Sequence, residues 1–218
     1  DHGWSMKHLH RLIVTSAAYR RGASIAGADD ATMKSDPNNH YYWRRRPMRM
    51  ESEVVRDSLL RLAGTLDRTL GGPTIDPKQD ATVFRRSLYF THSRDDQNEF
   101  LAMFDDADVF HCYRRTESIV PQQALTMANS RLTLAMARQL ALRLNEELGP
   151  VDDAAFADAA FETILCTPPS DADRAACLET LASLKRLLST NNHRQPDERA
   201  REDLVHALLN HNDFVVIR

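Results

Sequence analysis

The chain has 218 residues, of which 42% are hydrophobic and 27% charged, so it can bury a substantial core in one large domain or two joined lobes. Its formal net charge of −3 and isoelectric point near 6.3 argue against a general binder of nucleic acid or anionic membranes, because such proteins are usually basic. No stretch approaches 18 consecutive apolar residues, so the sequence predicts no membrane span.

Apolar spacing predicts a mainly α-helical fold with long irregular loops. In the first helix, Ser5 is the expected N-cap, and Leu9, Leu12 and Ile13 share one face. The predicted helices span 5–21, 51–70 (ended by Gly-Gly-Pro), 97–104, 121–129, 130–148, 152–166, 170–189 and 197–210. The aromatic run RRSLYF at 85–90 is the best candidate for a single short strand or hairpin.

Gly149-Pro150 is the clearest boundary in the sequence. We expect it to separate an N-terminal helical lobe at 1–149, which contains the irregular region 22–49, from a three-helix lobe at 150–218. The later helices carry more apolar side chains than three helices can bury among themselves, so we expect the two lobes to pack together.

Several catalytic and metal-binding classes lack their motifs in this chain. There is no G-x-S-x-G, no P-loop and no G-x-G-x-x-G, which argues against hydrolase, NTPase and dinucleotide-binding sites. His8 and His10 are two residues apart and would face different directions on a helix, so we expect no metal site. Cys112, Cys166 and Cys177 form no C-x-x-C-H, so no covalent haem is expected within this chain. Cys166 and Cys177 are expected to be buried free thiols, or a disulfide if the protein is secreted.

The segment YYWRRRPMRM at 41–50 interleaves aromatic and basic residues, a composition typical of surfaces that stack bases and bind phosphates. The residues concerned are Tyr42, Trp43, Arg44, Arg45, Arg46 and Arg49. In the alternative interpretation the arginines pair with nearby acids while Tyr42 and Trp43 anchor the loop. The acidic balance of the chain favours this second interpretation.

The segment 110–130 has the highest density of polar chemistry before a helix that begins at Pro121. Its candidate residues, with one carboxylate from another helix, are Cys112, Arg114, Arg115, Glu117, Gln122, Gln123 and Asp57. One interpretation is a structural clamp, in which arginines and glutamate form an ion network and the glutamines satisfy N–H groups of the first helical turn. The other is a polar pocket for an anionic sugar or sulfate, because the guanidinium fork suits such groups. We favour the clamp because structural ion networks are commoner than binding sites.

Eight ordered blocks resemble a known family. They include WSMKHLHRLIVTSAAYR at 4–20, DPNN at 36–39, ESEVVRDSLL at 51–60, GGP at 71–73, RRSLY at 85–89, FDDAD at 104–108, CYRRTESIVPQQAL at 112–125 and LLNHNDF at 208–214. The chain thus resembles the planctomycete-type domain of unknown function that ends long extracytoplasmic proteins. The resemblance implies a periplasmic or cell-surface location, and a parent protein that often carries a c-type cytochrome domain. It brings no catalytic residue, and any haem would belong to other domains of the parent.

Three functions are therefore to be compared. The first is a helical docking module that packs on neighbouring domains of its own parent protein. The second is the substrate-binding part of a redox or sulfated-polysaccharide-processing enzyme, with an anionic carbohydrate in the pocket around 112–123. The third, which the charge disfavours, is a nucleic-acid binder that uses 41–50. Because the chain begins at Asp1 without methionine, we expect a piece of a longer protein, and no compartment follows from a missing signal peptide.

Overall fold

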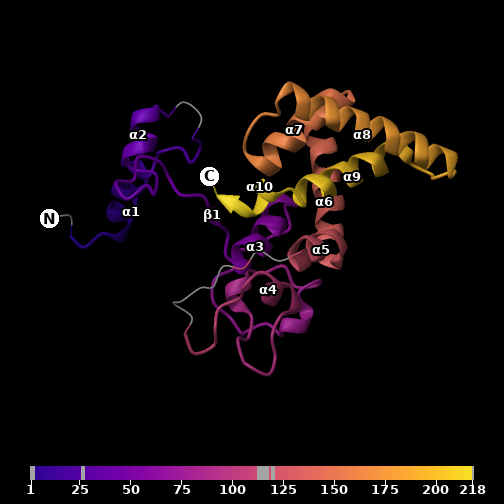
Figure 1. Ribbon diagram of the computed structural model, residues 1–218. Helices are drawn as coiled ribbons and strands as arrows, with labels where there is room; N and C mark the ends of the chain where they lie inside the picture. The colour runs from indigo at the N-terminus through magenta and orange to yellow at the C-terminus, as the bar shows by residue number, and fades with distance from the viewer. Residues whose placement is uncertain (1–2, 26–27, 112–117, 119–120, 218) are drawn as a thin grey trace. The chain divides into compact units, whose positions relative to one another are not determined.

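The structure is a computed structural model that describes residues 3–25, 28–111, 118 and 121–217 (Figure 1). It divides into two compact units: Asp1–Arg49 with Val216–Arg218, and Met50–Val215. Among the described residues α-helices dominate, and the one sheet has two strands. The predicted mainly α-helical fold is therefore confirmed.

The first unit contains two helices and a two-stranded antiparallel sheet. Its elements are α1 (Met6–Thr15), α2 (Asp30–Ser35), β1 (Met48–Arg49) and β2 (Val216–Ile217). Ser5 caps α1 as predicted, because its hydroxyl oxygen accepts the backbone N–H of His8 (3.3 Å). The helix ends at Thr15 rather than at 21, since the hydroxyl of Ser16 donates to the carbonyl of Ile13 and competes with a further helical turn.

The second unit opens with α3 (Ser52–Leu62), which ends well before the predicted limit at residue 70. Gly64 has a φ of +76°, a conformation that glycine adopts without strain. Beside it, the N–H of Thr65 donates back to the carbonyl of Leu60 (3.0 Å) and closes the helix end. The Gly-Gly-Pro at 71–73 lies in the following loop, so the prediction that it ends the helix was wrong.

The segment 85–90 is a turn and not the predicted strand. Ser87–Tyr89 forms the 3₁₀ helix η2. At the two ends of the segment, Arg85 makes an isolated backbone bridge with Asp67, and Phe90 makes one with Ile75. A second 3₁₀ helix, η1 (Pro77–Gln79), lies in the loop between Ile75 and Arg85. The aromatic run therefore serves to join two loops, and no extended strand pairs along it.

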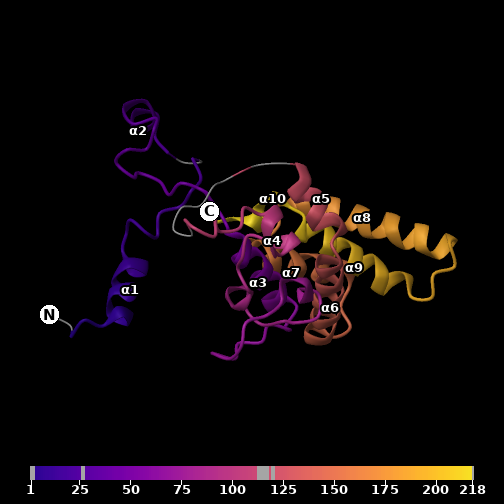
Figure 2. The ribbon, with the colours of Figure 1, turned by 90° about the horizontal axis from the view of Figure 1, so that it is seen from below.

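The remaining helices follow the predicted order closely. They are α4 (Glu99–Met103), α5 (Pro121–Asn129), α6 (Arg131–Leu148), α7 (Asp153–Leu165), α8 (Asp171–Thr190), α9 (Pro196–Leu209) and α10 (Asn212–Val215). Ser130 caps α6, and Ser170 with Asp173 forms a reciprocal capping box at the start of α8. Helix α9 packs against both α6 and α8, and the two ribbon views show α8 and α9 side by side (Figures 1 and 2).

One hydrophobic core runs through the second unit. It contains side chains from α3 to α10 that are at most 5% exposed, among them Leu59, Leu140, Phe156, Leu181, Leu209 and Phe214. Cys177 is buried against this core, and burial raises the pKa of its thiol. Cys166 is exposed at the end of α7, contrary to the expectation that both thiols are buried, and both are free thiols. No described helix is both long and apolar enough to cross a bilayer.

The lobe boundary expected at Gly149-Pro150 falls inside the second unit, between α6 and α7, and stays a prediction. Because α6 packs on both α7 and α9, separating 150–218 would expose one large face of the core. We expect limited proteolysis to release no stable, soluble and monomeric 151–218 fragment. Size-exclusion chromatography of the digest checks this, and recovery of such a fragment would show that the C-terminal helices form an independent domain.

Candidate functional site

Helix α3 separates the core of the second unit from a solvent-facing cleft. Val55 and Leu59 lie on its core face and are at most 1% exposed. Asp57 and Arg61 are offset from them by two positions and line the cleft. At 3.6 residues per turn, this offset places the two pairs on opposite sides of the helix.

Arg56 is the most deeply buried charged side chain of α3, with 0% exposure. Its guanidinium donates to four oxygen atoms at 2.7–3.3 Å, those of the Asp80, Val83 and Arg85 carbonyls and the Ser87 hydroxyl. The group also lies over the ring of Phe90, 4.7 Å from its centroid. Burial lowers the pKa of Arg56, while the carboxylates of Asp57 and Asp80 act in the other direction. Arg56 therefore ties the loop at 80–87 to α3.

Asp57 fixes the next turn of the same loop. Its Oδ1 accepts both the backbone N–H (2.8 Å) and the hydroxyl (2.7 Å) of Ser87. Its Oδ2 lies 3.5 Å from Nε of Arg86. Since Asp57 is itself held on a helix, the side chain of Arg86 is anchored at a fixed place beside α3.

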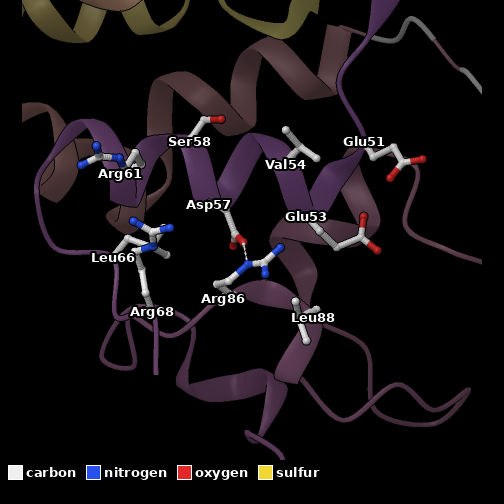
Figure 3. A pocket seen from close by; sticks show the side chains of 10 residues that line it. All are labelled: Glu51, Glu53, Val54, Asp57, Ser58, Arg61, Leu66, Arg68, Arg86 and Leu88. Atoms are coloured by element: carbon white, nitrogen blue, oxygen red, sulfur yellow. Dashed lines mark ion pairs between the residues drawn. The ribbon is translucent and has the colours of Figure 1, made fainter. Parts of the chain in front are cut away.

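The cleft next to this contact has a volume of about 740 Å³, and all the residues that line it belong to the second unit. Figure 3 shows Arg61 and Arg68 toward one end, the Asp57–Arg86 pair in the middle, and Glu51 and Glu53 toward the other end. The cleft therefore contains three arginines and three carboxylates, and its positive and negative charges are partly separated along its length. Such a surface can orient a polar ligand by its charge.

A second polar contact is built around Asp105, which has a φ of +59°. Its carboxylate accepts the backbone N–H (2.8 Å) and the hydroxyl (2.7 Å) of Ser118. The buried side-chain amide of Gln123 donates to the carbonyl and hydroxyl oxygens of Ser118, at 3.3 Å each. Gln123 therefore holds Ser118 next to the start of α5, and the clamp interpretation stays a prediction. Gln122 is exposed on α5.

The other residues of the predicted clamp or pocket lie outside the described residues. They are Cys112, Arg114, Arg115 and Glu117. The choice between a clamp and a pocket at 112–117 therefore stays a prediction. Asp57, which was predicted to join them, lies in the cleft with Arg86 as its ionic partner.

The basic and aromatic residues at 42–49 all belong to the first unit. Trp43 anchors its loop as predicted, because its indole N–H donates to the carbonyl of Asp36 (2.9 Å). Tyr42 is 69% exposed and does not anchor the loop. Arg44 and Arg46 donate to the backbone carbonyls of Ala23 and Asn38, and the charge of Arg46 also helps to lower the pKa of the nearby Asp36.

Asp36 supports the same loop from the inside. Its two carboxylate oxygens accept the backbone N–H groups of His40 and Tyr41, at 2.8 Å each. Burial alone would raise the pKa of Asp36, but these bonds outweigh it and the pKa lies below the usual value. Arg45 lies over the ring of Tyr19, and Arg49 belongs to β1. The arrangement of this loop is explained by internal bonds, and it has no continuous row of free cations among these residues.

Sequence reasoning missed the buried Arg56 and the cleft arginines Arg61, Arg68 and Arg86. One signal was available for Arg56, because it stands three and four residues before Leu59 and Leu60, on the apolar side of the helix. The cleft arginines come from three separate segments that only the tertiary fold brings together. Among the residues that the structure describes, no group of His, Cys, Asp and Glu could hold a metal ion.

The fold and the cleft define a mainly helical domain with a polar, arginine-containing surface site. The chain belongs to the PSD1 family, described as a protein of unknown function (DUF1553), whose model matches residues 1–181. This match confirms the predicted membership of a family of unknown function. No curated protein and no solved structure matches the chain.

Proposed function

We propose that the chain is a helical docking module of a larger multidomain protein and that α1 is the element that docks. The observation that carries this proposal is the apolar face of α1, none of whose residues is buried. The four side chains concerned are Met6, Leu9, Leu12 and Ile13, which are 45–61% exposed. An apolar helical stripe of this kind is normally covered by a partner.

The arrangement of α1 supports a specific mode of docking. At 100° per residue, Met6, Leu9 and Ile13 lie within about 60° of one another, while Lys7 and Arg11 lie on the opposite side. An amphipathic helix with this pattern suits an apolar groove with a polar rim. The occupant that we propose is a neighbouring domain of the same parent polypeptide, in keeping with the extracytoplasmic multidomain family that the sequence resembles.

The expected test result is a loss of docking when the apolar face of α1 becomes charged. Leu9→Asp and Ile13→Asp should each weaken binding of this chain to the separately produced remainder of the parent protein by about tenfold or more. The physical reason is that burying one such side chain contributes about 1.5–3 kcal/mol, and 1.4 kcal/mol corresponds to tenfold in affinity. Isothermal titration calorimetry measures the change.

Arg11→Gln is the matched control, because it changes the net charge by the same −1 on the side of α1 opposite Leu9 and Ile13, and it should leave the affinity unchanged. Thermal melting of each variant alone tells whether the apolar face instead packs within this chain. The proposal fails if the wild-type chain does not bind the remainder of the parent. It also fails if Leu9→Asp lowers the melting temperature of the isolated chain by several degrees while binding is retained.

The polar cleft favours a second candidate function, the binding of substrate for an enzyme whose other parts lie elsewhere in the parent protein. In this proposal the ligand is an anionic carbohydrate, and any c-type haem is held by another domain. The support is the set of arginines and carboxylates that surround Asp57. A periplasmic or cell-surface location is part of both proposals and rests on the resemblance of the sequence.

A further inference from the structure

The cleft on the outer face of α3 contains two arginines that differ from the other arginines around them. Arg56, Arg85 and Arg143 all donate to backbone carbonyl oxygens of the second unit. For Arg61 and Arg68, in contrast, no hydrogen bond or ion pair joins the guanidinium to another described residue. Two cations that bond to no other described residue therefore line one cleft, in a chain that is acidic overall.

A third guanidinium is fixed in the same cleft. Arg86 is held by Asp57, and Asp57 is in turn held by the N–H and hydroxyl of Ser87. The contact with Asp57 uses Nε of Arg86, so the two terminal nitrogen atoms of that guanidinium are left for another partner. Figure 3 shows Arg68 between Arg61 and the Asp57–Arg86 pair, so that the three side chains follow one another along the cleft.

The acidic groups of the cleft lie away from this arginine end. Along α3, Glu53 precedes Arg61 by eight residues, which corresponds to about 12 Å of helix. Glu53 also accepts the hydroxyl of Ser52 (2.9 Å). In Figure 3 the end of the cleft with Arg61 and Arg68 contains no carboxylate of the lining, whereas the guanidinium of Arg86 lies on the Glu53 side of Asp57. The charge of the lining is therefore positive at the end with Arg61 and Arg68.

The cleft also offers apolar surface to the rest of a ligand. Leu66 lies beside Arg68, and Leu88, which is 54% exposed, lies on the side of Arg86 away from Arg68 (Figure 3). A volume of about 740 Å³ is in the range of sites for small organic molecules. Together these features suit an oxyanion that is attached to a ring or a short apolar body.

We propose that this cleft binds an organic oxyanion, a carboxylate or sulfate ester of about one or two sugar rings, through Arg61, Arg68 and Arg86. The forked donors of arginine fit the paired oxygen atoms of both groups. The ring packs on Leu66 and Leu88. This inference deepens the second candidate function, because it places that ligand on α3, and it is independent of docking through α1.

The test is a titration of the full chain, followed by NMR or calorimetry, with glucuronate, glucose 6-sulfate and neutral methyl glucoside. Glucuronate or glucose 6-sulfate should bind with an affinity that falls as sodium chloride is raised, and methyl glucoside should not. The tighter of the two anions identifies carboxylate or sulfate as the preferred group. Binding of neither anion, or equal binding of methyl glucoside, overturns the proposal.

Variants locate the site. Arg61→Gln and Arg68→Gln should each weaken anion binding by about tenfold without a change in melting temperature, since neither guanidinium bonds to another of the residues that the structure describes. Arg194→Gln is the matched control, because Arg194 is exposed, carries the same charge and does not line the cleft. If Arg194→Gln weakened anion binding equally, the effect would come from the net charge of the chain. That result would overturn the assignment of the site to the cleft. Leu9→Asp should leave anion binding intact, which separates this result from failure of docking.

Discussion

Replacing Arg56 with alanine should lower the free energy of unfolding by about 3–5 kcal/mol. The variant removes the donor for three backbone carbonyls and one hydroxyl, and it leaves a cavity beneath the ring of Phe90. A buried acceptor that loses its hydrogen bond costs about 1–3 kcal/mol, so the loss of several at once is a large part of the stability of a domain. Urea denaturation followed by circular dichroism at 222 nm measures the change.

Tryptophan fluorescence is not a suitable probe of this unfolding transition. Trp4 and Trp43, the two tryptophans, belong to the first unit, whereas Arg56 lies in the second. Arg61→Ala is the matched control: it removes the same charge from the exposed face of the same helix and should change stability by no more than about 0.5 kcal/mol. Arg56→Lys should be intermediate, because an ammonium retains the charge but cannot reach all four oxygen atoms. Equal effects of Arg56→Ala and Arg61→Ala would contradict the role assigned to Arg56.

The elements that could be predicted from the sequence are those specified by nearby residues. The capping box of Ser170 and Asp173 spans three residues, and Pro121 and Ser130 mark helix starts on their own. The end of α3 was predicted wrongly because Gly-Gly-Pro is the stronger punctuation, whereas a single glycine, Gly64, ends the helix. Local signals therefore located the helices well but misplaced the C-terminal ends of α1 and α3.

The site was harder to predict because its residues come together only in the folded chain. Asp57 was predicted to join the arginines at 114 and 115, which lie outside the described residues, so that grouping stays a prediction. Its ionic partner in the structure is Arg86, from a segment whose aromatic residues suggested a strand. The turn at Ser87 depends on the carboxylate of Asp57, thirty positions earlier in the chain, and no local pattern contains that information.

The second large effect is expected at Arg201, which joins the two sides of the Gly149-Pro150 loop to α9. Its guanidinium donates to the side chain of Asn145 (2.7 Å), the carbonyl of Val151 (2.9 Å) and the carboxylate of Asp153 (3.2 Å). It also lies over the ring of Phe156, 4.6 Å from the centroid. We expect Arg201→Met to lower the free energy of unfolding by about 2–4 kcal/mol, because it leaves these groups without their shared cation.

Arg199→Met is the control on the same helix. Arg199 is 42% exposed in its side chain, and its ionic partners among the described residues are Glu202 and Asp203 of its own helix. Glu202 keeps Arg138 as a second partner, so removal of Arg199 should cost less than about 1 kcal/mol. Denaturant titrations of both variants at pH 7 give the comparison. A loss for Arg201→Met no larger than that for Arg199→Met would show that the contacts across the loop contribute little.

The pH dependence of the Arg201→Met effect provides a test of its mechanism. Burial alone would raise the pKa of Asp153, but the hydrogen bonds from Lys185 (2.6 Å) and Arg201 outweigh it, and the pKa is lowered. A carboxyl group with a lowered pKa in the folded state stabilises the fold fully above its unfolded pKa of about 3.9, and this contribution is lost as the pH falls through the folded pKa. The stability difference between wild type and Arg201→Met should therefore be constant from pH 5 to 7 and shrink below about pH 4. A difference that persists unchanged at about pH 2 would assign the effect to Asn145, Val151 and Phe156 and exclude a contribution from the ion pair with Asp153.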